Sequence, residues 1–587
     1  MTRTSGLTIT IALVLALASA PVVAQTAPGT APPAEPPSTN AMVNLIRLLV
    51  QQGTITRENG DQLLRQAEAE AGQARAAAGG LTPPPAGAVR VPYVPETVRK
   101  QIRDEIKGEV MKEAQAEGWA APNQRAPEWV NGLHPNADFR FRGEWDSFSR
   151  DNATDIVDYS AINNTVGGFD FLNNFNNIPI INTTEDRHRL RIRARVGFDF
   201  DLGRDSMIGV KLATGDDNGP ISTNQVLGGG LSKKNIWLDQ GYLKLAPYKW
   251  VTALAGRFPN PFFSTDLVYD RDLNFDGALL DVHPFNGNTA VALRGGAFPL
   301  KFGSDNFSSL TASTQNYRSP THWLFGGQLE ASQKLGAVKF TAGGAFYDFR
   351  NIQGQLSAPC LFNGQSRSIL ANDPVECSTD GTRAFFPRKG NTLFFLRNIV
   401  VEAPDTLPAS NRQLFGLTYK YQLLDLNAAI DFPLASIPMR LQGNYVRNLA
   451  YDRKDECRYG ADLGIPVTNV IVNNGNTNPC SVDDPAKVDS GNQGFLVRLL
   501  AGNRNPRKWG QWNLMGEYRY LQTDAVPDAF TDSDFHLGGT NAKGYSVSGT
   551  IGLMRGVNLT ARWMSANEIT GRPLGIDVFQ LDLNGEF

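Results

Sequence analysis

The stretch "RHRLRIRARVGFDFD", residues 187–201, decides the fold class. Arginine occupies every second position, apolar residues stand between, and only His188 interrupts the apolar row; the arginines are Arg187, Arg189, Arg191, Arg193 and Arg195. A period of two is typical of a β-strand with one polar and one apolar face. Because buried charges need partners or water, a packed soluble core cannot hold this row of arginines.

The surroundings of this arginine row follow from its spacing. Alternate residues of a strand lie about 6.6–7 Å apart, where like charges repel by about 0.6 kcal/mol in water and about 2.4 kcal/mol at an effective dielectric near 20. An arginine that faces lipid costs about 2–4 kcal/mol near the midplane. We therefore expect the arginines to face a wet lumen, while lipid contacts the other face, namely Leu190, Ile192, Ala194, Val196, Phe198 and Phe200.

The composition of the whole chain narrows the function classes. The 587 residues include 56 basic and 58 acidic ones, so no general attraction to nucleic acid is expected. After the first 25 residues, no apolar run approaches the roughly 18–20 residues of a membrane-spanning helix. Composition alone does not separate a soluble β-protein from a membrane β-protein.

The N-terminus indicates export. The first residues, "MTRTSGLTITIALVLALASAPVVAQ", carry Arg3, a short apolar stretch and small residues before Gln25. This pattern predicts a secretory signal peptide, residues 1–24, rather than a retained membrane anchor. We expect residues 25–135 to form a periplasmic helical and linker region, and residues 136–587 to form an outer-membrane β-barrel.

Apolar residues at helical spacing predict three helices in the region before the barrel. Two short amphipathic helices are expected within residues 41–74, with Thr56 as the N-cap of the second. A third is expected at about 96–117, where the apolar residues form a narrow stripe. That stripe is compatible with a short coiled coil or with a solvated linker helix.

From about residue 137 the period of two continues to the end of the chain. In "DFRFRGEWDSF", for example, Arg140 and Arg142 share a polar face opposite an aromatic one. Long and short connections alternate, as in outer-membrane barrels. The sixteen predicted strands are 138–148, 187–202, 206–214, 235–246, 250–258, 277–284, 288–298, 321–333, 337–349, 412–432, 437–449, 493–502, 509–522, 542–555, 557–569 and 575–587. Because the alternation slips within 412–432, a bulge or a further pair of strands, making eighteen, is the alternative there.

The last strand carries the most specific feature of the sequence. "DVFQLDLNGEF" alternates apolar and polar residues up to the terminal Phe587. This ending resembles the signal that the barrel-assembly machinery of the outer membrane reads on its substrates. We therefore assign Phe587 as an assembly signal.

Several other segments point to one family. "VPYVPETVRKQIRDEIKGEVMKEAQAEGWAAPN", "RHRLRIRARVGFD", "KLATGDDNGPISTN", "LDQGYLKL" and "AGRFPNPFFSTDLVYDRDLNFDGALLD" together resemble the "putative porin" family of Gram-negative outer membranes. The resemblance covers most of the chain after about residue 41. It implies a β-barrel channel in outer-membrane lipid, either monomeric or a homotrimer, with a periplasmic N-terminal helical segment.

The charged residues suggest how such a pore would be lined. We expect the basic lining to comprise Arg140, Arg142, Arg187, Arg189, Arg191, Arg193, Arg195 and Arg257. By analogy with porins whose third loop folds inward, the acidic residues of "STDLVYDRDLNFDG" are expected to narrow the pore, namely Asp266, Asp270, Asp272 and Asp276. The arginine row then either favours anionic solutes or serves as a structural ladder paired with acids on neighbouring strands or on an infolded loop.

Metal and enzyme signatures are weak. Asp272, Asn274 and Asp276 match the first half of a calcium loop, but position 12 is His283 where a glutamate is needed. A tight acidic turn is therefore the preferred interpretation, and no cofactor is expected. The five histidines are scattered without metal-binding spacing, and no nucleophile motif occurs in a suitable context. We expect no enzymatic activity.

The four cysteines fit an exported protein, because disulfides persist in oxidising compartments. Cys360 and Cys377 lie in one polar segment, and Cys457 and Cys480 lie in another. Two local, loop-closing disulfides are favoured over a metal site, although three pairings remain open.

These features together predict an outer-membrane porin that lets small hydrophilic solutes, anionic ones if the arginine row is selective, diffuse passively through a water-filled lumen. The alternative is a non-conducting barrel that acts as a receptor or adhesin through its long surface loops. The sequence does not name the solute.

Overall fold

The computed structural model divides the chain into two compact units, residues 1–124 and 125–587. In the first unit, residues 46, 48–50 and 58–66 are helical, where the two short helices were expected. The predicted signal peptide and the predicted helix at 96–117 lie outside the described residues. Besides a few residues between 46 and 69 and residue 130, the structure describes 132–587 except 166, 217–218, 306–316, 363–376, 402–410, 454, 456–469 and 472–489.

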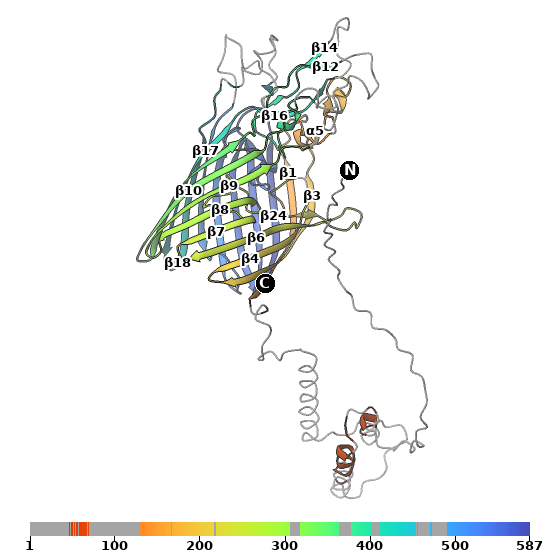
Figure 1. Cartoon of the computed structure of the whole chain (residues 1–587), viewed down its shortest axis with the longest axis vertical. Coiled ribbons are helices and arrows are strands. Elements are labelled where there is room, and N and C mark those ends of the chain that lie inside the picture. Colours follow the sequence, from red (N-terminus) through yellow and green to blue (C-terminus); the bar gives the residue numbers. More distant parts are fainter. Residues whose placement is uncertain are drawn as a thin grey trace, which may run out of the picture. The chain divides into compact units, whose positions relative to one another are not determined.

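A closed antiparallel β-barrel dominates the described part of the second unit (Figure 1). Neighbours in sequence pair with each other, and the last strand pairs with the first, so the sheet has no free edge. Its sixteen long strands are β1 (Leu133–Phe148), β3 (Arg187–Gly203), β4 (Ser206–Thr214), β6 (Ile236–Tyr248), β7 (Val251–Pro259), β8 (Asn274–Phe285), β9 (Thr289–Lys301), β10 (His322–Leu335), β11 (Val338–Arg350), β17 (Tyr421–Leu434), β18 (Ile437–Asn448), β20 (Gln493–Gly502), β21 (Trp512–Leu521), β22 (Ala542–Met554), β23 (Val557–Glu568) and β24 (Gly575–Glu586). The predicted sixteen strands are confirmed.

The region of slipped alternation, 412–432, splits between the barrel and a loop. Strand β17 begins only at Tyr421, whereas residues 412–417 form two short strands that pair within the loops. The predicted alternative of eighteen strands is therefore wrong. The short elements of the loops are β2 (Phe169–Asp170), β5 (Gln225–Val226), β12 (Cys360–Phe362), β13 (Leu393–Phe395), β14 (Ile399–Val401), β15 (Arg412–Gln413), β16 (Phe415–Leu417), β19 (Val470–Ile471) and the helix α5 (Tyr159–Asn163).

The connections differ at the two ends of the barrel, which we name the loop rim and the turn rim. The turn between β3 and β4 uses Arg204 and Asp205, both with positive φ (52° and 61°). Positive φ at both central residues matches the twist of the flanking strands in a two-residue hairpin. The long connections all leave the strands at the loop rim, and Figure 1 shows α5, β12, β14 and β16 of these connections over that end of the barrel. No helix among the described residues has the length and apolar character of a membrane crossing.

The two faces of the barrel wall differ in polarity. In β1, Phe139, Phe141 and Trp145 are exposed on the outside, whereas Arg142 and Glu144 are buried on the inside. On β3, the predicted lipid-facing residues Leu190, Val196, Phe198 and Phe200 are exposed in the same way. The outer apolar face is expected for a barrel in lipid.

The buried core lies inside the barrel, between the wall and the loops. It includes aromatic residues that point inward from β7, β8, β9 and β11, and further residues from the connections at the loop rim. Since a barrel of this strand number encloses more space than its own side chains fill, loops that fold inward shape the lumen.

Candidate functional site

Two strands set a row of acids beside the row of arginines. The antiparallel register of β1 and β3 places Asp138 opposite Arg195, Glu144 opposite Arg189 and Asp146 opposite Arg187. Side chains opposite one another on the same face of a sheet lie within contact distance. The wall of the lumen therefore carries its own counter-charges.

The three arginines of the row nearest the loop rim, Arg187, Arg189 and Arg191, make close ion pairs with acidic residues of β1. Arg189 Nη2 lies 2.7 Å from Glu144 Oε1 and 2.6 Å from Asp146 Oδ2. Arg191 Nη1 lies 3.2 Å from Glu144 Oε2, and Arg187 Nε lies 3.4 Å from Asp146 Oδ2. All three arginine side chains retain 20–29% exposure, so they contact the lumen.

The two arginines of the row nearer the turn rim, Arg193 and Arg195, form ion pairs with the wall and with an acidic residue of the third loop, residues 260–273. Asp138 pairs with Arg193 and Arg195 from the wall, at 3.0 and 2.7 Å. Asp272 of the loop approaches the same two guanidinium groups at 3.1 and 3.4 Å. Burial alone would disfavour the charged form of Asp272, but the nearby Arg193 and Arg140 outweigh it and lower the pKa of this carboxyl.

The third loop crosses the lumen and is fixed at its far side. The Phe263 backbone N–H donates to Gln328 Oε1 of β10 at 2.8 Å, and Thr265 Oγ1 donates to Asn444 Oδ1 of β18 at 2.6 Å. Asp266 Oδ2 lies 3.1 Å from Arg498 Nη2 of β20. Because β18 and β20 stand on the far side of the barrel from β7 and β8, the loop crosses the lumen, and its role as a constriction stays a prediction.

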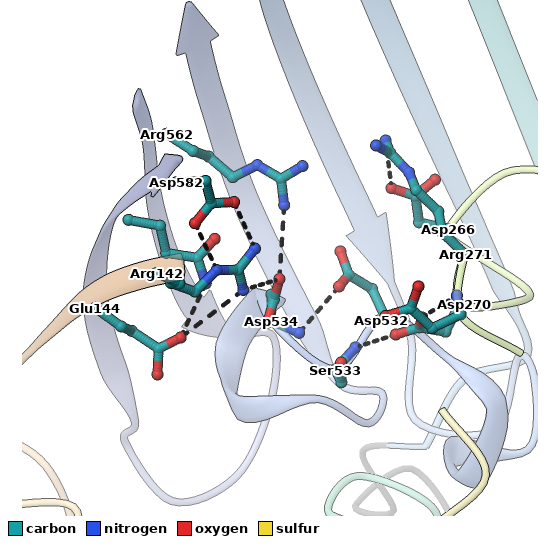
Figure 2. A network of polar contacts seen from close by, with 12 residues as sticks. Arg142, Glu144, Asp266, Asp270, Arg271, Asp532, Ser533, Asp534, Arg562 and Asp582 are labelled. Atoms are coloured by element: carbon teal, nitrogen blue, oxygen red, sulfur yellow. Dashed lines mark hydrogen bonds and ion pairs between the residues drawn. The ribbon is translucent and has the colours of Figure 1, made fainter. Parts of the chain in front are cut away.

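A second loop, residues 522–541, also enters the lumen. Its Asp534 lies 2.8 Å from Arg142 Nη1 and 3.8 Å from Arg562 Nη1, so it is held by β1 and β23 (Figure 2). Its Asp532 pairs with Arg519 of β21 at 2.9 Å. This loop could not be recognised from the sequence, because its acids lie in a segment without periodicity and their partners are distant in the chain.

The two loops are joined directly. The Ser533 N–H donates to Asp270 Oδ2 at 2.8 Å, and the Asp270 N–H donates to the Phe530 carbonyl at 2.8 Å, as Figure 2 shows for the first of these contacts. Burial, together with the nearby Asp532 and Asp272, raises the pKa of Asp270 well above its ordinary value. By contrast, Arg142 and Arg562 overcome the effect of burial and lower the pKa of Asp534.

A cavity of about 70 Å³ separates the basic wall from the acidic loops. We call its surroundings the constriction; they comprise Arg140, Arg142, Asn224, Asp266, Asp270, Arg271, Asp272, Asp532, Ser533, Asp534 and Arg562. A wider polar cavity of about 420 Å³ lies toward the turn rim and includes Arg195, Lys211 and the terminal Phe587 in its lining. The constriction is thus a small cavity lined only by polar and charged side chains.

Two of the predicted pore residues lie elsewhere. Arg257 and Asp276 are paired in register, next to the register pair of Phe258 and Phe275. Both phenylalanines are buried inside the barrel, so the alternation of the strands puts Arg257 and Asp276 on its outer face. The expected position of Arg257 in the pore lining and of Asp276 in the constriction is corrected accordingly.

The residues of the partial calcium motif have separate partners. Asp272 contacts the arginines of β3, Asn274 Nδ2 donates to Asp239 Oδ1 at 2.7 Å, and Asp276 pairs with Arg257 at 2.9 Å. The three side chains therefore do not converge on one point. In the described part of the chain, no group of three or more His, Cys, Asp or Glu residues could hold a metal ion.

One of the two predicted disulfides is present. Cys360 and Cys377 are bonded, and both are fully buried. The bond joins strand β12 to the segment that precedes Asp380, within the long connection of β11 and β17. Cys457 and Cys480 lie outside the described residues.

Comparison with solved structures finds matches at low similarity. OprB of Pseudomonas putida is 9% identical over 78% of this chain and 96% of that chain, with a TM-score of 0.40. The outer membrane channel DcaP of Acinetobacter baumannii is 10% identical over 78% and 98%, with a TM-score of 0.33. Salmonella typhi OmpF, in complex with daunomycin, is 8% identical over 78% and 99%, with a TM-score of 0.36.

A search of curated protein sequences finds no significant match. The family comparison, in contrast, matches residues 39–587, which is nearly the whole chain. The matched range includes all sixteen strands and both loops of the constriction. This chain therefore belongs to the porin family described as "Putative porin".

Proposed function

We propose that this protein is an outer-membrane porin through which small hydrophilic solutes diffuse passively. The observation that carries the proposal is the constriction, a polar cavity between Arg140, Arg142 and Arg562 on the wall and Asp270 and Asp534 on the loops. Lumen-facing charges bind and orient a hydrated solute without forming covalent bonds. Family membership and the apolar outer face of the barrel support a location in the outer membrane.

We further propose a modest preference for anions. Most arginines of the lumen have carboxylate partners within about 3.4 Å, which offsets their charge. Arg140 and Arg562 are the exceptions, since each lies 3.8 Å from its nearest carboxylate oxygen and retains 19–20% exposure. An incompletely compensated cation in a narrow passage favours anions over cations.

The proposed orientation follows from the two rims. The short turns and the N-terminal region, residues 25–135, would face the periplasm, and the long loops would face the outside of the cell, as in outer-membrane barrels. Phe587 ends the chain at the turn rim, where its N–H donates to the Ala137 carbonyl at 2.9 Å. That position suits a terminal signal for the barrel-assembly machinery, because the last strand of this chain, β24, must pair with β1 to close the barrel.

Conductance across a planar lipid bilayer tests the channel. The purified full-length protein should produce discrete conductance steps, and the reversal potential in a salt gradient should show weak anion preference. A folded barrel that produces no steps would overturn the proposal and favour a receptor or adhesin that acts through the loops.

The anion preference has its own test. Replacing both Arg140 and Arg562 by alanine should shift the reversal potential toward that of a non-selective pore. Arg504→Ala is the matched control, because Arg504 lies in a turn at the turn rim with its side chain 60% exposed. An unchanged reversal potential in the double variant would show that these arginines do not select solutes.

A further inference from the structure

The chain that follows Asp534 in the second loop has an uncommon backbone conformation. Four consecutive residues have positive φ, namely His536 (53°), Leu537 (61°), Gly538 (81°) and Gly539 (88°). We call residues 536–539 the left-handed turn. Glycine adopts this conformation freely, but histidine and leucine adopt it only at an energetic cost. Such a segment persists where its surroundings hold it in place.

The ring of His536 holds the left-handed turn through both of its nitrogen atoms. Nε2 lies 2.8 Å from the carbonyl oxygen of Leu574; because a carbonyl can only accept, Nε2 carries the proton. Burial, together with the nearby Lys389, keeps the pKa of His536 well below its ordinary value, so the ring is neutral. Nδ1 is therefore an acceptor, and Lys389 Nζ donates to it at 2.5 Å.

Lys389 reaches the left-handed turn from the long connection between β11 and β17. The residue is only 8% exposed, and among the described residues His536 is the one side-chain partner of its amino group. Its backbone is close as well, since its carbonyl oxygen accepts from the Thr540 N–H at 2.9 Å. A Cβ atom at Gly539 would lie 2.1 Å from the same oxygen. Lys389 thus contacts the turn with both its side chain and its backbone.

The left-handed turn determines where the preceding residues point. Phe535 is 4% exposed and packs against buried residues of β22, β23 and β24, with the guanidinium of Arg519 over its ring at 4.3 Å. Asp534 comes directly before it, and its carboxylate lies 2.8 Å from Arg142 and 3.8 Å from Arg562 (Figure 2). A change of the turn to negative φ would redirect the chain within two residues of Asp534.

We infer that Lys389 and His536 are positioning residues of the constriction: by fixing the left-handed turn, they hold Asp534 beside Arg142 and Arg562. They thereby set the charge that a solute meets. The inference rests on the proposed function, in which the charges of the constriction bind the solute. Neither residue belongs to the described lining of the constriction, so both act through Asp534.

The sign of the effect follows from this arrangement. When the turn relaxes, Asp534 moves away and leaves more positive charge at the constriction. A carboxylate that moves from about 6 to about 12 Å from the solute loses half of its Coulomb interaction, which corresponds to about a threefold rise in the permeability ratio of anions to cations. The loss of the charge of Lys389 itself would act in the opposite direction, because it removes a cation.

Reversal potentials of the full-length protein in a planar bilayer test the inference. Lys389→Met and His536→Ala should each raise the permeability ratio of anions to cations about threefold. Lys420→Met is the matched control and should leave the ratio unchanged, because Lys420 is an exposed residue just before β17. In an Asp534→Asn background, neither of the first two changes should have a further effect.

A milder variant covers the case in which these changes prevent folding. Asparagine tolerates the left-handed conformation but is too short to bond both Lys389 and Leu574, so His536→Asn should shift the ratio in the same direction by less. An unchanged ratio in a conducting variant, or an equal shift with and without the Asp534 carboxylate, would overturn the inference. A folded wild type without conductance steps would overturn the proposed function, and the inference with it.

Discussion

The wall formed by β1, β3, β23 and β24 carries charged side chains into the lumen, whereas the wall formed by β7 to β11 carries aromatic ones. On the charged side, Arg142 bonds Asp582 at 2.7 Å across the β1–β24 seam and also Asp534. On the aromatic side, Phe262 of the third loop packs edge-on against Phe275, Phe298 and Tyr347. Both sides hold a loop inside the barrel, one by ion pairs and one by apolar contact.

The two sides of the barrel fix their loops by different interactions, so that a loop can be held firmly while part of the lumen stays hydrated. The aromatic side excludes water and anchors the third loop by buried area, which is not directional. On the charged side, each charged side chain needs defined partners and keeps contact with water. This side of the lumen therefore stays hydrated. A variant on one side should therefore change stability and solute passage in a different proportion from a variant on the other.

The largest effect is expected for Arg142→Ala on the charged side. The side chain of Arg142 is 3% exposed, and its removal leaves Asp582 and Asp534 with only the more distant guanidinium groups of Arg140 and Arg562, each 3.8 Å away. Breaking a buried pair in this way costs roughly 3–5 kcal/mol. Denaturant unfolding of the protein in lipid vesicles would measure the loss. A change no larger than that of Arg562→Ala would contradict the assigned role of the buried network.

On the aromatic side, Phe262→Ala should destabilise the protein by about 3 kcal/mol. This is at the lower end for a buried phenylalanine, since the loop can settle into part of the space. The third loop would lose its anchor, so single-channel recordings should show larger and noisier steps. Phe302→Ala is the control, because Phe302 is 69% exposed. Recordings as quiet as those of the wild type would show that the ion pairs alone hold the loop.

The second loop should respond to pH. Burial, assisted by the nearby Asp524, raises the pKa of Asp528 from 3.8 to about 7, although the Arg388 N–H donates to the carboxylate. The folded state therefore retains a proton that the unfolded state releases near pH 4. The resulting stability is fully present below about pH 4 and is lost as the pH rises to about 7.

Protease digestion of the second loop between pH 4 and 8 would measure this response. The loop should be cut faster at the upper end of the range, after correction for the intrinsic rate of the protease. Asp528→Asn should weaken this pH dependence, since an amide keeps an acceptor and does not titrate. An equal slope in the variant would assign the effect to another group, for example Asp524, whose pKa is raised by burial to about 6.

The smallest effect is expected for Asp272→Asn, which tests the charge balance of the constriction. The change removes one negative charge beside Arg193 and Arg195. A unit charge about 6 Å from a solute ion contributes about 0.7 kcal/mol in water, favourable for one sign of ion and unfavourable for the other, which corresponds to about a tenfold rise in the permeability ratio of anions to cations. Reversal potentials would detect it, and Asp201→Asn at the turn rim is the control. A shift toward cations would contradict the proposed balance.

The barrel could be predicted because its information is local. A period of two assigns each residue of a strand to a face, and alternating loop lengths order the strands, so β3 and β24 were recognised from their own residues. The slip at 412–432 was visible too, but the sequence could not show that residues 412–417 pair with loop segments. Arg257 was misplaced in the lumen because the apolar side chain next to it, Phe258, was expected to face lipid. In the structure Phe258 faces an aromatic core inside the barrel, so Arg257 faces outward.

The constriction could be predicted only in part. The third loop is recognisable in the sequence by its four aspartates in a short span, and three of them lie in the lumen. The second loop has no such signal, because the meaning of Asp534 depends on Arg142, which lies 392 residues earlier in the chain. A contact of that sequence separation is set by barrel closure, and no local pattern encodes it.

The seam between β1 and β24 links assembly to permeability. Arg142 and Asp582 face each other across the pair of strands that closes the barrel, and the same guanidinium fixes Asp534 of the second loop. The second loop is therefore not fixed in the lumen until β1 and β24 have paired. When these two strands separate, the contact that fixes the loop is lost first. Leakiness of the pore would thus report an incomplete seam before the rest of the sheet unravels.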